Sequence, residues 1–357
     1  MSSHQDPTQI LELRIDSSSV RHHDESLNEH DSICLLKAPL HEFLRYSREE
    51  MSKWLIDLAH DICDPANLRG SLLVWEELSQ DWVPVAPTEP LTASVYRYQL
   101  PPGIFVDLSK LSRPEARFVV GTCAVESVIQ RDGACWVTGC LDPIKATQIC
   151  PKRIGDDIGQ QILRTFANLD PLPGLSICDE IFCLALTSVM DFWFREYRLG
   201  FRHVSQDAYE CHVFARDFDD TLYTLRGQYP KSYTPSAPCE LPQLLHGHRA
   251  APAQRQPQSP SRPPPGLFRW HYLQCVINQF AHEDYKSLAH IHLPGPSLQM
   301  EQMAEDREGM EDSDNDLTDD EFELPLTVSD LGADLGHLLY IKEGEEGVVG
   351  SPWGLAT

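Results

Sequence analysis

Apolar residues recur at helical spacing behind a polar start signal near residue 47. The sequence Ser47-Arg-Glu-Glu50 has the spacing of a capping box, in which Ser and Glu side chains satisfy free amides in the first turn of a helix. The pattern predicts a helix that begins at Ser47 and ends before Asp64 and Pro65. The residues expected on its buried side are Met51, Trp54, Leu55, Leu58, Ala59 and Ile62.

A second helix is predicted to begin at Ser112, where Glu115 repeats the capping-box spacing, and to end at Gly133. Its expected buried stripe is Phe118, Val125, Val128 and Ile129. The segment between the two helices predicts strands at 71–75 and 94–100, and a loop in the proline-rich stretch 84–90.

The middle of the chain alternates between short apolar runs and one long helical pattern. Residues 134–140 and 146–151 are expected to be extended, with a turn at Gly139 and a stop at Pro151. Residues 179–198 have helical spacing. The last predicted elements are a pair of strands at 199–204 and 209–215, which alternate like a hairpin.

Composition separates a folded part from polar tails. Residues 1–30 are polar and predict a disordered arm, and the proline-rich 251–265 predicts a linker. Residues 301–357 predict an acidic and mostly disordered tail. The expected fold class is α+β, with folded regions at 31–130, 131–245 and a return segment at 266–293.

Charge and cysteine usage limit the class of protein. The formal net charge of −25 excludes a strongly basic nucleic-acid binder as a property of the whole chain. There is no uninterrupted apolar run of membrane-spanning length, and the first residues lack the pattern of a secretory signal. The 11 cysteines form no CxxC pair, which favours reduced buried thiols. We therefore expect an intracellular protein, in the cytoplasm or the nucleus, with no membrane association.

Four pieces of the sequence, taken in order, resemble the HNH endonuclease domain found in many fungal proteins. They are RDGACWVTG (131–139), ATQICPKR (146–153), DFWFREYRLGFRHV (191–204) and PPPGLFRWHYLQCVINQF (263–280). The resemblance implies a small ββα-metal unit, in which two strands and a helix clasp one divalent metal ion. It also implies phosphodiester hydrolysis, in which a strand His acts as general base and the metal stabilises the phosphate charge.

The residues that match the family's catalytic positions depart from its pattern. Gln148 stands at the general-base His position, and an amide cannot take up a proton near neutral pH. Asp191 stands at the helix His and could still bind Mg²⁺ or a similar ion. Arg195 replaces the family's acid, and its positive charge opposes a metal; the middle Asn position falls near Cys183. His203 is the nearest substitute base in the sequence.

Two functional interpretations follow from these departures. The first is a descendant of a metal-dependent endonuclease whose site is weak or inactive, with at most one divalent ion at Asp191. A small basic cluster is its expected contact with DNA, formed by Lys145, Lys152, Arg153 and Arg164. The alternative is a non-catalytic protein-interaction module that uses the acidic tail and the proline-rich linker.

Three other patterns favour ordinary structural roles. Cys135, Cys140 and Cys150 lack the tight pairs of a zinc site and favour packing as small apolar residues. The run Asp217-Phe-Asp219 resembles a phosphatase nucleophile motif, but no apolar strand leads directly into it, so a polar turn is expected. The acids of 312–323 have the spacing of a calcium loop without its central Gly, which favours a solvated acidic stretch.

Overall fold

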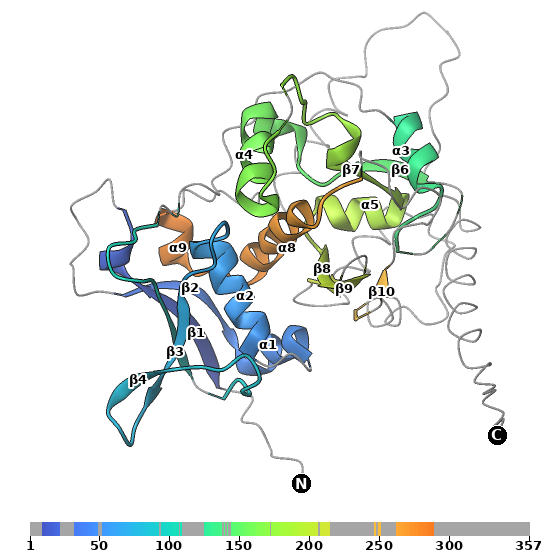
Figure 1. Cartoon of the computed structure of the whole chain (residues 1–357). Coiled ribbons are helices and arrows are strands. Elements are labelled where there is room, and N and C mark those ends of the chain that lie inside the picture. Colours follow the sequence, from blue (N-terminus) through green and yellow to red (C-terminus); the bar gives the residue numbers. More distant parts are fainter. Residues whose placement is uncertain are drawn as a thin grey trace, which may run out of the picture. The chain divides into compact units, whose positions relative to one another are not determined.

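The computed structural model describes residues 9–21, 32–48, 52–92, 94–106, 108, 125–137, 139, 141, 144–171, 173–205, 208–214, 246–247, 249–250 and 262–288. These residues divide between two compact units, and each unit is assembled from separate stretches of the chain. Unit 1 contains the described residues of 1–120, 150–177 and 264–322. Unit 2 contains those of 121–149 and 178–263. Both units mix helices with strands, so the described chain is α+β, and none of its helices is long and apolar enough to cross a membrane (Figure 1).

Unit 1 is built on a five-stranded sheet with the order β2-β1-β5-β3-β4. β1 pairs in parallel with β5, and the other neighbouring strands are antiparallel. In β1, the alternation places Leu11, Leu13 and Ile15 in the core, while Glu12 lies on the other face and pairs with Lys37 at 2.8 Å. The strands are β1 (Ile10–Asp16), β2 (Ser32–Pro39), β3 (Ser71–Glu76), β4 (Asp81–Pro84) and β5 (Val95–Gln99).

Helix α8 is the central helix of unit 1 and is buried nearly all round. Trp54 on α2 donates a hydrogen bond from Nε1 to the Tyr272 hydroxyl on α8 at 2.8 Å, which satisfies two polar groups inside the core. The ring of Phe280, at the end of α8, stacks on Phe43 of α1 with centroids 5.0 Å apart. The helices of this unit are α1 (Leu40–Ser47), α2 (Ser52–Cys63), α4 (Gly155–Ala167), α8 (Pro265–Phe280) and α9 (Glu283–Leu288).

The stretch 264–288 also covers one edge of the sheet. Leu36 of β2 forms an isolated antiparallel bridge with Ala281, and the His282 amide donates to the Leu35 carbonyl at 3.0 Å. At the start of α8, a Cβ added to Gly266 would lie 2.4 Å from the backbone of Ala167, so α4 and α8 approach at a distance that only glycine permits. The return segment is therefore an integral part of unit 1.

Unit 2 contains a two-stranded sheet, β6-β7, and a three-stranded sheet, β10-β9-β8. Helix α5 follows β7 without a connecting loop, and the ring of Phe194 on α5 lies 5.4 Å from Phe201 on β8. The elements are α3 (Val125–Asp132), β6 (Ile144–Gln148), β7 (Cys183–Thr187), α5 (Ser188–Arg195), β8 (Leu199–Ser205), β9 (Ala208–Val213) and β10 (Arg249–Ala250).

Several predicted elements are present as expected. The strands β3 and β5 and the hairpin β8–β9 lie where the sequence predicts them. Helix α2 ends at Cys63, and its predicted stripe is buried at Trp54, Leu55, Leu58, Ala59 and Ile62. Helix α3 ends at Asp132, followed by Gly133 at φ 72°, a left-handed conformation that glycine adopts without strain.

The predicted disordered arm and the first capping box are wrong in part. Residues 1–30 include β1, whose alternation in ILELRID was hidden between polar flanks. Ser47 is the last residue of α1 and not the cap of α2; α2 begins at Ser52, whose hydroxyl and amide both donate to the Glu89 carbonyl. The predicted start at Ser112 lies outside the described residues, and Val125 of the predicted stripe is 45% exposed.

Two predictions in the middle of the chain are also wrong. Residues 134–137 form a turn and not a strand. The helix predicted at 179–198 is a strand, β7, followed by the shorter helix α5, because apolar residues at 183–187 are buried on both faces of a sheet and so carry no strand alternation. Residues 150–177, which include α4, belong to unit 1.

Candidate functional site

The register of β6 and β7 divides the matched residues between the two faces of the sheet. Ala146 pairs with Ala185, and Gln148 pairs with Cys183, so these residues share one face. Val128 of α3 packs in a buried cluster with Cys183 and Ala185 on that face. Gln148 therefore lies on the face covered by α3.

The opposite face carries Asp191 and its partners. Thr147 is 1% exposed and donates a hydrogen bond from Oγ1 to Asp191 Oδ1 at 3.0 Å. Arg195, one turn further along α5, places Nη2 2.9 Å from Asp191 Oδ2. Both oxygens of a carboxylate that is 8% exposed are therefore engaged by the protein itself.

The structure joins Asp191 to the neighbour of Gln148 rather than to Gln148. Successive residues of a strand point to opposite faces, so the bond from Thr147 to Asp191 places the Gln148 side chain on the other face of the β6–β7 sheet. The expected pair of side chains at 148 and 191 therefore does not meet on one face. The sequence had already marked Arg195 as a cation that opposes a metal, and the structure places it directly on Asp191.

His203 lies on β8, in the separate three-stranded sheet of unit 2. Its ring centroid is 5.3 Å from that of Tyr209, its partner in the β8–β9 register, and Tyr209 in turn lies 5.9 Å from Trp136. This aromatic packing gives His203 a structural environment on the hairpin.

A buried ion pair fixes β7 from the side opposite β6. Arg131 donates from Nε and Nη2 to the two oxygens of Asp132 at 2.7 and 2.8 Å, and both residues are 4% exposed. Asp132 Oδ2 also accepts the Ala185 amide at 2.8 Å, and the Cys183 carbonyl accepts from Arg131 at 2.7 Å. From the sequence, Arg131 and Asp132 were predicted only to end a helix. Their role was missed because the backbone groups that they bind, at Cys183 and Ala185, are 52 and 53 residues away in the chain.

The turn after Gly133 completes that edge. The Trp136 amide donates to the Ala185 carbonyl at 3.0 Å, and Asp132 accepts the Ala185 amide. Both backbone groups of Ala185 on this edge of β7 therefore have partners, although residues 134–137 do not form the predicted strand. The piece RDGACWVTG thus contributes to the small sheet through isolated bonds rather than through a strand.

The predicted basic cluster is split between the two units. Lys145 lies on an exposed position of β6 in unit 2, whereas Lys152, Arg153 and Arg164 belong to unit 1.

The cysteines of the described residues are free thiols, and burial makes several of them poor ligands. Burial raises the pKa of the Cys150 thiol in unit 1 and of the Cys211 thiol in unit 2, which disfavours the thiolate that a metal would require. Cys135 is 2% exposed, and Cys140 lies outside the described residues. Within the described part of the chain, no three His, Cys, Asp or Glu side chains gather in a group that could hold a metal ion.

The remaining sequence motifs lie beyond the described residues. These are the run Asp217-Phe-Asp219, the acids of 312–323, the acidic tail and most of the proline-rich 251–265. No protein-family model, curated protein or solved structure matches the chain.

Proposed function

We propose that unit 2 contains an HNH-like ββα unit whose metal position is closed by an arginine, so that the protein descends from a divalent-metal endonuclease but does not hydrolyse phosphodiesters efficiently. The order of elements supports this proposal, because an antiparallel strand pair, β6–β7, leads directly into a short helix that carries Asp191. The strand β6 overlaps the predicted extended segment 146–151, but its partner is β7 at 183–187 and not the predicted segment 134–140.

The contact that carries the proposal is the ion pair between Arg195 and Asp191. A divalent ion at Asp191 would need the carboxylate oxygens that Thr147 and Arg195 now occupy, and it would be repelled by the guanidinium 2.9 Å away. Gln148, at the position of the family's general base, has no proton affinity near neutral pH and lies on the other face of the β6–β7 sheet from Asp191. Losing a general base typically costs about 10²–10⁴ in rate. Both requirements for hydrolysis are therefore impaired.

Metal binding by an Arg195→Ala variant tests this proposal. Removing the guanidinium exposes Asp191 Oδ2, so the variant is expected to gain weak Mn²⁺ binding, measured by the loss of the free-Mn²⁺ electron paramagnetic resonance signal. The gain should disappear in the double variant Arg195→Ala/Asp191→Asn. The matched control is Arg164→Ala, which removes the same charge from an exposed position of α4.

Two outcomes oppose the proposal. If Arg195→Ala binds no more Mn²⁺ than Arg164→Ala, the position of Asp191 is not an ancestral metal site. If the unaltered protein nicks plasmid DNA in Mg²⁺, Mn²⁺ or Zn²⁺ and loses this activity in Asp191→Ala, the enzyme is active and the proposed closure is wrong.

A further inference from the structure

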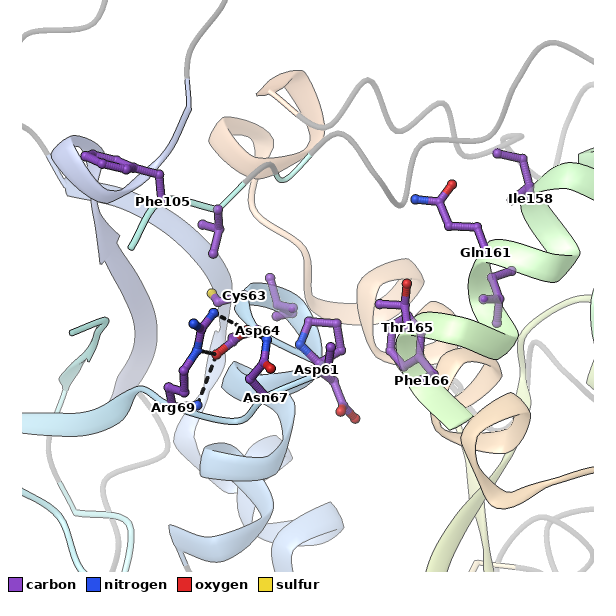
Figure 2. Close-up of a pocket in the computed structure, with 15 residues that line it drawn as sticks. Asp61, Cys63, Asp64, Asn67, Arg69, Phe105, Ile158, Gln161, Thr165 and Phe166 are labelled. Atoms are coloured by element: carbon purple, nitrogen blue, oxygen red, sulfur yellow. Dashed lines mark hydrogen bonds and ion pairs between the residues drawn. The ribbon is translucent and has the colours of Figure 1, made fainter. Parts of the chain in front are cut away.

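Unit 1 contains a hollow of about 230 Å³ beside α4 (Figure 2). It has three walls, which are the end of α2 with residues 64–69, residues 105–106, and residues 158–166 of α4. The charges in the first wall are already balanced, because Arg69 pairs with Asp64 at 2.8 Å and Arg269 of α8 pairs with Asp61. The Phe105 ring points away from α4 (Figure 2), so the three walls do not converge on one ligand.

The edge of the three-stranded sheet in unit 2 carries contacts that the proposed function does not use. β10 pairs antiparallel with β9 and lies beside it (Figure 1). Next to this short strand, the Gly247 amide donates to the Cys211 carbonyl at 2.7 Å. Further along β9, the Val213 amide donates to Nδ1 of the His246 side chain at 3.2 Å. The last bond of this edge is therefore made by an imidazole instead of a backbone carbonyl.

This hydrogen bond fixes the protonation state of His246. A backbone N–H can only donate, so Nδ1 must carry a lone pair, and the proton of the neutral ring lies on Nε2. In the imidazolium both ring nitrogens carry a proton, and the one on Nδ1 would face the Val213 N–H. The closed edge therefore requires a neutral His246, and proton uptake at Nδ1 breaks the bond.

A second histidine of this edge adds to the effect. The His212 ring is fully buried and stacks on the His246 ring, with centroids 5.0 Å apart and planes at 20°. Glu210, on the same face of β9, places Oε1 3.6 Å from His212 Nε2, which favours a proton on His212. A charge on His212 then opposes a second charge on the stacked ring of His246.

Three arginines of neighbouring segments act against Glu210. They are Arg202 of β8 and Arg249 of β10, which are both register partners of Glu210, and Arg198 just before β8. Their positive charges disfavour a proton on either ring. The other titratable side chains in the described residues of these strands alternate onto the opposite face; they are His203, Tyr209 and Cys211. The closed edge therefore binds a proton at His246 more weakly than an open edge does.

We propose that the contacts of 246–250 with β9 form a pH-sensitive clip, which is closed while His246 is neutral and opens as His246 takes up a proton. An exposed imidazole has a pKa of about 6.5, so protonation of the released ring favours the open form below that pH, by up to about tenfold per pH unit. Opening removes the partners that 246–250 provides to β9, and a strand edge that loses its partners can pair with another strand. The clip includes none of the residues at the proposed metal position, so it goes beyond the function proposed for unit 2.

Hydrogen exchange of the full chain, read at single amides, tests the clip. The protection factor compares each amide with an unstructured amide at the same pH. For the amides of Val213 and Gly247 it should fall about tenfold between about pH 7.5 and about pH 5.5. Amides in the β8–β9 ladder should keep their protection over the same range.

Variants of His246 separate the proton from the hydrogen bond. In His246→Asn, Oδ1 is attached to Cγ as Nδ1 is in histidine, so the variant keeps an acceptor for the Val213 amide but cannot titrate. His246→Ala lacks the acceptor and should lower the protection of the Val213 amide about 3- to 10-fold already at about pH 7.5. In both variants the dependence on pH should be absent. His41→Asn, at an exposed position of α1, is the matched control and should keep the full dependence.

Three outcomes would overturn the proposal. The first is a protection factor at Val213 that does not fall with pH in the unaltered chain. The second is a fall of the same size in either variant of His246. The third is an equal loss of protection along the β8–β9 ladder, which would mean that the whole sheet opens and not the clip.

Discussion

The Thr147 hydroxyl and the Asp191 carboxylate share a hydrogen bond of 3.0 Å that links β6 to α5 across one face of the small sheet. Asp191 also holds Arg195, so a residue expected to bind a metal instead connects a strand, a helix and a surface cation. This network makes the site a source of stability whose parts can be tested separately from any chemistry.

Thr147→Val should destabilise the protein by about 1–3 kcal/mol, because it leaves Asp191 Oδ1 buried without its donor. Thr187→Val is the matched control. Its Oγ1 is buried without a hydrogen-bond partner among the described residues, so its removal should be neutral or stabilising. Urea unfolding followed by circular dichroism measures both changes. Equal losses in the two variants would contradict the importance of the Thr147 bond.

Gln148→His should not create nuclease activity by itself. The new imidazole would lie on the face covered by α3, on the other side of the β6–β7 sheet from Asp191. Plasmid nicking in Mg²⁺ and Mn²⁺ should therefore match that of the unaltered chain, while circular dichroism shows an unchanged fold. Metal-dependent cleavage gained by this single change would refute the assignment of the two residues to different faces.

Asp132→Asn should cost about 3–5 kcal/mol, because it leaves the Arg131 guanidinium buried without its counter-charge. Arg195→Ala breaks an ion pair whose arginine side chain is 60% exposed, and it should cost at most about 1 kcal/mol. Thermal unfolding of the two variants compares a buried with an exposed pair. A similar fall in Tm for the two variants would show that burial does not determine how much each ion pair contributes to stability.

His60 should make unit 1 less stable as the pH falls below about 6.5. Burial lowers the pKa of His60 in the folded chain, although Asp57 and Asp64 oppose this shift and Arg269 adds to it. The unfolded chain therefore takes up the proton first, and stability is lost between the unfolded and folded pKa values. In the folded chain, His60 Nδ1 lies 2.6 Å from the Tyr98 hydroxyl.

The measurement is the free energy of unfolding between pH 7.5 and about pH 5. In His60→Asn the loss over this range should be smaller than in the unaltered chain, whereas His41→Asn, at an exposed position of α1, should keep the full loss. A pH profile that His60→Asn leaves unchanged would rule out this linkage.

The sequence predicted elements where one local signal dominated. The alternation in Val95–Gln99 and the stripe that includes Trp54 and Leu58 were sufficient, because each of these elements has one buried face and one more exposed face. In Ser71–Glu76 the adjacent Leu72 and Leu73 are both buried, and the short apolar run itself marked the strand. The pattern failed at 183–187, where both faces are buried and alternation disappears. It also failed at Ser47, because a polar residue before an apolar run can end one helix as well as begin the next.

The candidate site was predictable only in part. Asp191 and Arg195 are one turn apart on any helix, so their pairing follows from sequence. The choice of Thr147 over Gln148 depends on the strand register, which a resemblance between short motifs does not fix. The hollow beside α4 could not be predicted, since its walls come from residues 61–69, 105–106 and 158–166 and meet only through tertiary packing.

The position of α8 in unit 1 has a consequence for biosynthesis. The strands of unit 1 all lie before residue 100, yet the helix that fills their core and the segment that covers β2 come after residue 264. A ribosome adding 5–20 residues per second needs on the order of ten seconds to reach them. During that interval we expect the apolar surface that α8 later covers to be exposed on the nascent chain, where a chaperone could protect it from aggregation.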